Sequence, residues 1–143
     1  MKVLMLNGSC NPKGCTYTAL TEVGKTLTSA GIDYEIVQLD GGPVRDCIGC
    51  NQCSKSGCVF TDGGVNDFIA KARQADGFVF GTPVYYAHPS GRVLSFLDRV
   101  FYAGGSAFAG KPGAAVASAR RAGTTASLDA LGKYFGISDM VTV

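Results

Sequence analysis

Four cysteines near the middle of the chain have the residue type and the spacing that metal chemistry requires. Cys47, Cys50, Cys53 and Cys58 form the pattern C-x2-C-x2-C-x4-C. Three thiolates at x2 spacing can curl around three corners of an iron–sulfur cubane, and the fourth needs a chain reversal that Gly57 can supply. The first interpretation is therefore a [4Fe-4S] cluster with these four cysteines as ligands.

Other interpretations of the cysteines stay open. Zinc also binds four thiolates, although structural zinc sites usually place two pairs farther apart. The cysteines can instead be small buried side chains, form disulfides, or be a vestigial pattern that holds no metal. Cys10 and Cys15 belong to a different loop and are not counted as ligands.

A second group of residues with binding-site chemistry follows the first apolar run. Residues 7–18 read N-G-S-C-N-P-K-G-C-T-Y-T, with two glycines for tight turns and hydroxyl groups at Ser9, Thr16 and Thr18. Free N–H groups and the positive end of a helix dipole attract an anion there. The segment matches neither a Walker A loop nor G-x-G-x-x-G, which favours a terminal monophosphate such as that of FMN. The alternative is that these residues only cap a helix.

Two later loops supply aromatic and basic side chains. Pro83, Val84, Tyr85 and Tyr86 follow a buried strand, where a flat aromatic ring can stack. Ser118, Arg120 and Arg121 follow another strand, and a cation there would stabilise negative charge on a reduced flavin or meet a phosphate of NADPH. Each Arg can equally form a surface ion pair, and the lone His88 is given no role.

Hydrophobic periodicity predicts the elements that position these loops. Strands are expected at 3–6, 34–39, 77–81, 114–118 and 140–143, with Pro83 ending the third. Helices are expected before Gly31, over 65–75, over 93–101, and from a Thr124 or Thr125 cap to Gly136. Alternation of strands and helices predicts an α/β fold, a three-layer, doubly wound parallel five-stranded sheet of flavodoxin-like order 2-1-3-4-5, with the Cys-rich loop at 41–63. The chain stops at its fifth strand, so the final helix, which would cover this strand, is expected to be absent and to leave an apolar face bare. Either the chain is truncated or a partner subunit covers that face.

Composition sets the broad class of protein. Residues 1–143 fit a single domain, with 46% hydrophobic and 17% charged residues and a mean hydropathy of +0.17. No apolar run is long enough to span a membrane. A net charge of +2, with basic residues scattered along the chain, argues against a nucleic-acid partner. The start of the chain resembles no signal peptide, so a cytoplasmic location is expected, where thiols stay reduced.

Taken together, these motifs resemble the NAD(P)H-dependent FMN reductases of flavodoxin-like fold, and most closely their iron–sulfur flavoprotein branch. The resemblance covers essentially the whole chain, and its most specific motif is the cysteine pattern. It implies that Ser9, Gly14, Cys15, Thr16 and Thr18 hold the FMN phosphate, that Pro83 to Tyr86 flank the ring, and that Ser118 to Arg121 contact its other edge. Family members commonly have Arg or Lys where this chain has Asn11, so phosphate binding would depend more on Lys13 or the backbone. A homodimer or homotetramer with the flavin at an interface is also implied.

The function expected is an FMN-dependent oxidoreductase. Hydride would pass from NAD(P)H to FMN, and electrons would pass to a small-molecule or protein acceptor, with the [4Fe-4S] cluster as a candidate carrier. One alternative is a non-enzymatic, flavodoxin-like electron-transfer module that a protein partner reduces. Another is a structural metal-binding protein without flavin. No Ser-His-Asp set or paired carboxylate indicates hydrolytic chemistry.

Overall fold

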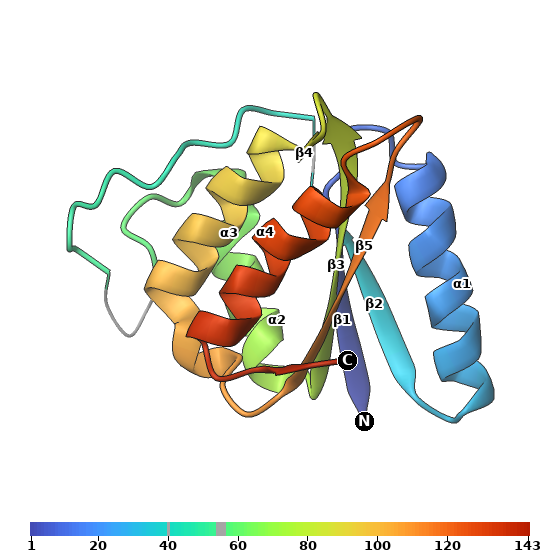
Figure 1. The fold of residues 1–143 in the computed structure, drawn as a ribbon. Coiled ribbons are helices and arrows are strands. Elements are labelled where there is room, and N and C mark those ends of the chain that lie inside the picture. Colours follow the sequence, from blue (N-terminus) through green and yellow to red (C-terminus); the bar gives the residue numbers. More distant parts are fainter. Residues whose placement is uncertain (40, 54–56) are drawn as a thin grey trace.

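The fold alternates strands and helices along the chain, as the periodicity predicts (Figure 1). It is described by a computed structural model that covers residues 1–39, 41–53 and 57–143. The strands are β1 (Lys2–Asn7), β2 (Asp33–Gln38), β3 (Gly77–Tyr85), β4 (His88–Pro89), β5 (Pro112–Ser118) and β6 (Val141–Thr142). The helices are α1 (Cys15–Ser29), α2 (Val65–Gln74), α3 (Gly91–Gly104) and α4 (Thr124–Ile137), with short 3₁₀ turns η1 (Asp62–Gly64) and η2 (Gly105–Ala107).

The sheet has the order β2-β1-β3-β5-β6, and all of these neighbours are parallel. The short strand β4 lies off this path and pairs antiparallel with β3. When the β4 hairpin is set aside, the five parallel strands have the predicted order 2-1-3-4-5. The winding direction reverses between β1 and β3, so their carboxyl ends open a crevice at one edge of the sheet.

The two faces of the sheet are covered unequally. Figure 1 shows α2, α3 and α4 on one face and α1 on the other. The side with three helices holds the larger core, in which seven phenylalanine rings pack against each other: Phe68, Phe78, Phe80, Phe96, Phe101, Phe108 and Phe135. On the α1 side an open, largely apolar groove of about 320 Å³ runs between α1 and the strands, with Val3, Leu27 and Ala114 among its lining residues. This groove lies on the side of the sheet that α1 alone covers (Figure 1).

Three predicted boundaries are wrong. Pro83 does not end the third strand, which continues to Tyr85. A proline removes one backbone donor but keeps its carbonyl, and the carbonyl of Pro83 accepts a hydrogen bond from the Ser90 N–H (3.2 Å). Pro112 and Gly113 are part of β5 instead of preceding it. Neither Thr124 nor Thr125 caps α4, because Gly123, in the left-handed region at φ 99°, occupies the N-cap position.

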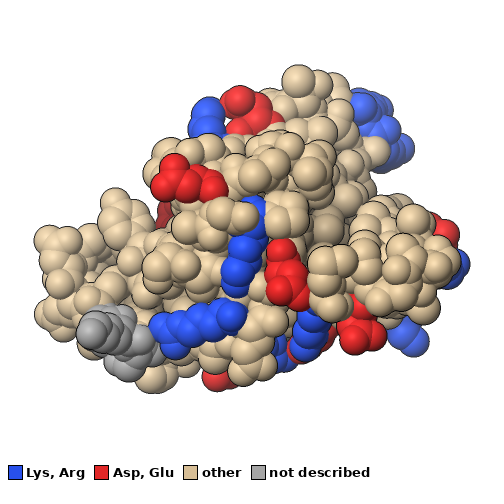
Figure 2. All heavy atoms as spheres, turned by 90° about the horizontal axis from the view of Figure 1, so that it is seen from below, with Lys and Arg blue, Asp and Glu red and all other residues tan. Residues whose placement is uncertain are grey.

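Charged residues of both signs are interspersed on the face shown in Figure 2. Among the ion pairs of the structure, Glu35 of β2 pairs with Lys2 (2.6 Å) and with Lys71. In the ranges that the structure covers, each helix is too short or too polar to cross a lipid bilayer.

Candidate functional site

The loop between β1 and α1 is held by side chains that imitate backbone turns. The Asn7 carboxamide oxygen accepts the Ser9 N–H (3.2 Å), the Ser9 hydroxyl accepts the Asn11 N–H (3.1 Å), and the Asn11 carboxamide oxygen accepts the Lys13 N–H (3.1 Å). Such side-chain turns fix a loop without regular secondary structure. Its own side chains therefore fix the conformation of the loop before α1.

The amino end of α1 directly follows this loop. Gly14 is the N-cap residue, and no described side chain caps the helix. Cys15 begins the helix and is exposed, while the Thr18 hydroxyl donates to the Gly14 carbonyl (3.2 Å). The first turn of a helix carries unsatisfied N–H groups and a partial positive charge, so this end can receive an anion.

A hydroxyl pair ties this loop to the neighbouring strand end. The Thr16 and Ser118 hydroxyls lie 2.7 Å apart, and Thr16 is buried. Thr16 therefore points toward β5, not into solvent. Its hydroxyl joins the first turn of α1 to the end of β5.

The β3–β4 hairpin presents two tyrosines at the same edge. Its turn residues, Tyr86 and Ala87, have φ values of 52° and 60°, as in a type I′ turn, where Asn and Gly are preferred. Each such non-glycine residue costs about 1–3 kcal/mol and persists only where its surroundings enforce it. Tyr86 is fully exposed and Tyr85 is about half exposed (51%).

The hairpin contacts both neighbouring loops. The Tyr85 hydroxyl lies 3.8 Å from the Cys10 sulfur, and this hydrogen bond, together with burial, raises the pKa of Tyr85. On the other side Gly123 packs so closely that a Cβ added to it would lie 2.3 Å from the Ala87 Cα. The three loops therefore form one continuous rim.

A hollow of about 710 Å³ lies between the hairpin and the loop after β5, with Val84, Tyr86, Ala87, Arg120, Arg121 and Ala122 around it. This volume is within the usual range for small-molecule sites. Arg120 and Arg121 are exposed, and no ion pair holds either of them within the part of the chain that the structure describes. Two cations therefore lie at the wall of this hollow.

The structure thus brings together at one sheet edge the residues predicted to bind a cofactor: Ser9, Asn11, Lys13, Gly14, Cys15, Thr16, Thr18, Pro83, Val84, Tyr85, Tyr86, Ser118, Arg120 and Arg121. Pro83 is buried in β3 beside Ser118, whereas Asn11 and Lys13 are exposed on the loop. Sequence reasoning missed Asn7 and Gln38. The Gln38 side chain accepts from Asn7 (2.6 Å) and donates to the Ser9 carbonyl (2.6 Å), and its only signal was a polar residue ending a strand.

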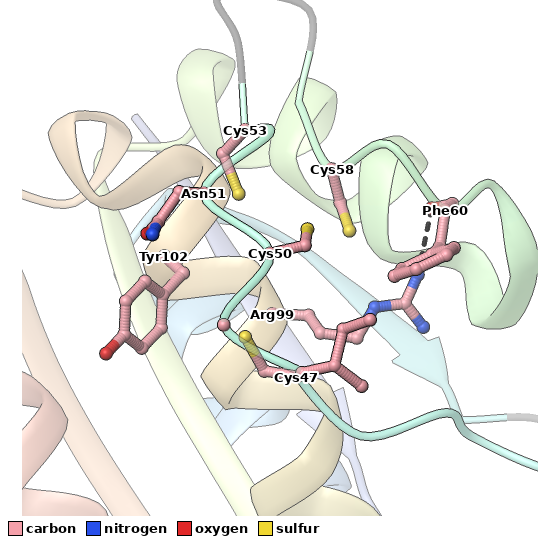
Figure 3. Close-up of a pocket in the computed structure, with 10 residues that line it drawn as sticks. Cys47, Cys50, Asn51, Cys53, Cys58, Phe60, Arg99 and Tyr102 are labelled. Carbon is pink, nitrogen blue, oxygen red and sulfur yellow. Dashed lines mark hydrogen bonds between the residues drawn. The ribbon is translucent and has the colours of Figure 1, made fainter.

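The four cysteines of the C-x2-C-x2-C-x4-C pattern line a single cavity of about 220 Å³ beside α3. Figure 3 shows the thiols of Cys50, Cys53 and Cys58 directed toward a common space, with Cys47 below them. Burial, and then the thiols of Cys58, Cys50 and Cys47, raise the pKa of Cys53. The four thiols therefore share one cavity.

Left-handed residues make the cysteine segment curl. Gly49 (φ 61°) lies between the first two cysteines, Asn51 (φ 55°) between the second and third, and Gly57 (φ 120°) before Cys58. Gly and Asn adopt this region most readily. Gly57 also cannot carry a Cβ, which would lie 2.3 Å from the Asn66 side chain.

A single metal ion and a cluster make different demands on four thiols. A tetrahedral zinc site with Zn–S bonds of about 2.3 Å brings its sulfurs within roughly 4 Å of each other. A cubane instead holds its thiolates on four separate corners. Among the described residues, no group of three or more Cys, His, Asp or Glu side chains is arranged to hold a metal ion.

One face of α3 holds the cysteine segment. Arg92, Ser95, Arg99 and Tyr102 recur at helical spacing, and each faces the segment. Arg92 donates to the Gly42 carbonyl (2.9 Å), and the Ser95 hydroxyl donates to the Asp46 carboxylate. Sequence reasoning read only the apolar stripe of this helix and missed the polar one.

Asn66 of α2 holds the far end of the segment. Its carboxamide oxygen accepts the Cys58 N–H (2.7 Å), and its amide donates to the Cys58 carbonyl (2.9 Å). This pair of bonds mimics a strand pairing. No sequence pattern indicates it, because the two residues become neighbours only in the folded loop.

Comparison with known proteins identifies the family. Residues 1–143 match the sequence family described as NADPH-dependent FMN reductase. An iron–sulfur flavoprotein of Methanocaldococcus jannaschii is 31% identical over 147 residues, covering 100% of this chain and 76% of that protein. An iron–sulfur flavoprotein of Archaeoglobus fulgidus is 32% identical over 99 residues, covering 69% of this chain and 48% of that protein.

Solved structures support the fold. An NAD(P)H:quinone oxidoreductase from Methanothermobacter marburgensis superposes with a TM-score of 0.77 at 16% identity, covering 100% of this chain and 83% of that one. A flavodoxin from the domain Archaea gives a TM-score of 0.69 at 15% identity, covering 100% and 78%. The flavodoxin-like architecture is confirmed. Because the family match spans the whole sequence and the first relative is similar throughout, this chain belongs to the NADPH-dependent FMN reductase family, among its iron–sulfur flavoproteins.

Proposed function

We propose that this chain binds FMN across the three loops at the carboxyl edge of its sheet and works as an NAD(P)H-dependent oxidoreductase. The observation that carries the proposal is that an uncapped helix end lies at the same sheet edge as a hollow between a tyrosine hairpin and an Arg-Arg loop. When bound, FMN supplies the redox chemistry by accepting a hydride and releasing electrons in pairs or singly.

The β1–α1 loop is the proposed phosphate site. The backbone N–H groups at the start of α1 would bind the phosphate oxygens, and Lys13 adds the charge that Asn11 lacks. The turns formed by Ser9 and Asn11 fix the conformation of this loop before the phosphate binds, which lowers the conformational entropy lost on binding.

The hairpin and the loop after β5 are the proposed ring site. Tyr86 would stack on the ring, and Tyr85, held by Cys10, would close the side facing the phosphate. Arg120 or Arg121 would stabilise negative charge that accumulates on the ring as it is reduced. The protein contributes orientation, exclusion of water and charge, and no acid or base is required of it.

Cys47, Cys50, Cys53 and Cys58 are the proposed ligands of a [4Fe-4S] cluster. Their shared cavity and the left-handed residues between them support this assignment. A cluster, when bound, carries one electron at a time and would link the flavin to a one-electron acceptor. A homodimer or homotetramer and a cytoplasmic location belong to the same proposal.

Anaerobic reconstitution with FMN, iron and sulfide tests the proposal. We expect saturable FMN binding, four irons and four sulfides per chain on the basis of the ligand set, and oxidation of NADPH or NADH in the presence of ferricyanide or a quinone. Cys50→Ala should remove the broad iron–sulfide absorbance, whereas Cys10→Ala should keep it. Absence of saturable FMN binding by folded protein would contradict the flavin site.

The same experiment separates the electron-transfer alternative. A protein that binds FMN but whose flavin stays oxidised under both NADPH and NADH would be a module reduced by a protein partner. Iron uptake without FMN binding would indicate a structural metal protein.

A further inference from the structure

Arg99 is the most deeply buried charged residue described in the molecule, and it lies directly against the cysteine cavity. It projects from α3, is 1% exposed, and is one of the residues that line this cavity. Figure 3 shows its guanidinium group beneath Cys50 and Cys58, pointing toward Phe60. A buried guanidinium cannot lose its proton, so a fixed positive charge stands beside the four thiols.

Arg99 joins the two ends of the cysteine segment. One terminal nitrogen donates to the carbonyl of Phe60 (2.8 Å) and to Asp62, through its carbonyl (3.2 Å) and its carboxylate (3.1 Å). The other donates to the carbonyl of Arg45, before the first cysteine (3.4 Å). One side chain therefore hydrogen-bonds to the backbone on both sides of the cysteines.

The charge of Arg99 is only partly balanced by protein groups. Asp62 is its ion-pair partner, but the Asp62 side chain is 42% exposed and also pairs with Arg45 (3.6 Å). Two guanidinium groups thus share one carboxylate, which leaves a net positive charge at the wall of the cavity. Burying an incompletely compensated charge is costly, so an anion is the expected occupant.

One donor of Arg99 is also unsatisfied. Its Nε–H is buried and has no acceptor among the described residues. Buried donors are almost always hydrogen-bonded in folded proteins. A sulfur of an anionic iron–sulfur cluster would satisfy this donor and the charge together, because four thiolates outweigh the positive charge of the iron–sulfide core.

We propose that Arg99 is the residue that positions the cluster loop and sets the reduction potential of the cluster. The inference rests on the proposed cluster. Reduction by one electron adds negative charge beside a fixed buried cation, so Arg99 favours the reduced form and raises the potential. A purely structural Arg would hold the loop without affecting the redox equilibrium.

The test compares Arg99→Met, Arg99→Lys and Arg45→Met after anaerobic reconstitution with iron and sulfide. Arg45→Met is the matched control, because it removes a charge near the same loop from a side chain that is 56% exposed and does not line the cavity. Cluster potentials are measured by redox titration followed by electron paramagnetic resonance, and flavin potentials by absorbance.

We expect Arg99→Met to lower the reduced-to-oxidised ratio of the cluster at fixed ambient potential at least tenfold, which is about 59 mV for a one-electron couple. Arg99→Lys keeps the charge and should shift the potential less. Arg45→Met should shift the cluster potential less than Arg99→Met does, because water screens the charge of this exposed side chain. The flavin potential should stay near the wild-type value. If Arg99→Met does not retain iron, Arg99→Gln provides the neutral variant.

Two failures are distinguishable. Wild-type protein that takes up no iron overturns the cluster, and the inference with it. Full iron content in a neutral Arg99 variant with an unchanged cluster potential overturns the role of Arg99 alone.

Discussion

The hydroxyl groups of Thr16 and Ser118 lie 2.7 Å apart, although 102 positions separate the two residues in the sequence. Thr16 belongs to the first turn of α1, and Ser118 ends β5. This contact fixes the proposed phosphate site relative to the loop that carries Arg120 and Arg121. This hydrogen bond is therefore one of the contacts that set the relative position of the two halves of the proposed site.

Replacing Thr16 by Val should uncouple these halves. Val keeps the shape of Thr but leaves the Ser118 hydroxyl without its partner, so the free energy of unfolding should fall by about 1–2 kcal/mol. FMN affinity should fall as well. Urea denaturation and FMN titration measure the two effects.

Thr21→Val is the matched control, because the Thr21 hydroxyl donates to the Tyr17 carbonyl of its own helix (2.9 Å) and joins no second element. It should leave FMN affinity unchanged. Equal FMN affinities for Thr16→Val and wild type would show that the contact does not position the site.

Gly123→Ala should damage the hairpin side of the site. Its φ of 99° disfavours any side chain, and the new Cβ would lie 2.3 Å from the Ala87 Cα. Relief requires movement of the strained Tyr86–Ala87 turn, so a loss of about 1–3 kcal/mol in stability and a weaker FMN site are expected. Thermal denaturation and FMN titration test this.

Gly132→Ala supplies the opposite control on the same helix. Gly132 is in the helix interior, and a Cβ added to it would meet no described atom of another element within 4 Å. This substitution should stabilise the protein by about 0.5–1 kcal/mol. Similar effects of the two changes would contradict the close approach at Gly123.

Arg120→Ala and Arg121→Ala should identify which cation faces the flavin. Both side chains are exposed beside the hollow, so each substitution should leave the fold intact. Loss of the cation that faces the ring or the phosphate should weaken FMN binding about fivefold, from a contribution of about 1 kcal/mol. Lys133→Ala, an exposed cation paired with Asp129 on the same helix as Thr124, is the control. If neither Arg variant differs from this control, the loop does not bind the cofactor through charge.

The sheet order was predictable because short strands alternate with helices that each have one apolar stripe, which is the pattern of a doubly wound parallel sheet. Strand ends were less predictable. Pro83 is a usual strand breaker, but tertiary pairing with Ser118 and the β4 hairpin extends β3 past it. Local patterns cannot show such pairings, because the partner residues come from elsewhere in the chain.

The gathering of the four cysteines around one cavity and the place of the first loop at the sheet edge were predictable, because the residues of each group are close together in the sequence. The residues that hold them were not. Arg99 and Asn66 lie on helices whose apolar residues dominate the pattern, and their roles depend on which loop packs against them. The one signal available in the sequence is the polar stripe of α3 at Arg92, Ser95, Arg99 and Tyr102, which recurs at helical spacing.

Stability should depend on pH through Glu35. Hydrogen bonds from Lys2 and Lys71 hold the pKa of Glu35 below its ordinary value of 4.5. The charged form is therefore favoured in the folded state, and its contribution is present above about pH 4.5 and lost as the pH falls through the lowered pKa. Glu35→Gln should destabilise the protein by roughly 1 kcal/mol or less at pH 7.

Urea denaturation of both proteins across this pH range checks the sign. The difference in the free energy of unfolding between wild type and Glu35→Gln should shrink on acidification below the ordinary pKa of 4.5. A difference that grows as the pH falls would contradict the depressed pKa.

Asn66→Ala should weaken the grip on Cys58. Two hydrogen bonds to the Cys58 backbone are lost, one of 2.7 Å and one of 2.9 Å, and Gly57 gains room to move. The fourth proposed ligand would then sample positions away from the other three thiols. We expect about 1–3 kcal/mol less stability and faster loss of iron to a chelator.

Asp67→Asn, at an exposed neighbouring position on the same helix, should release iron at the wild-type rate. Asn66→Asp keeps the acceptor for the Cys58 N–H and should fall between the two. Iron release from Asn66→Ala as slow as from Asp67→Asn would show that Cys58 is held by the metal and not by the helix.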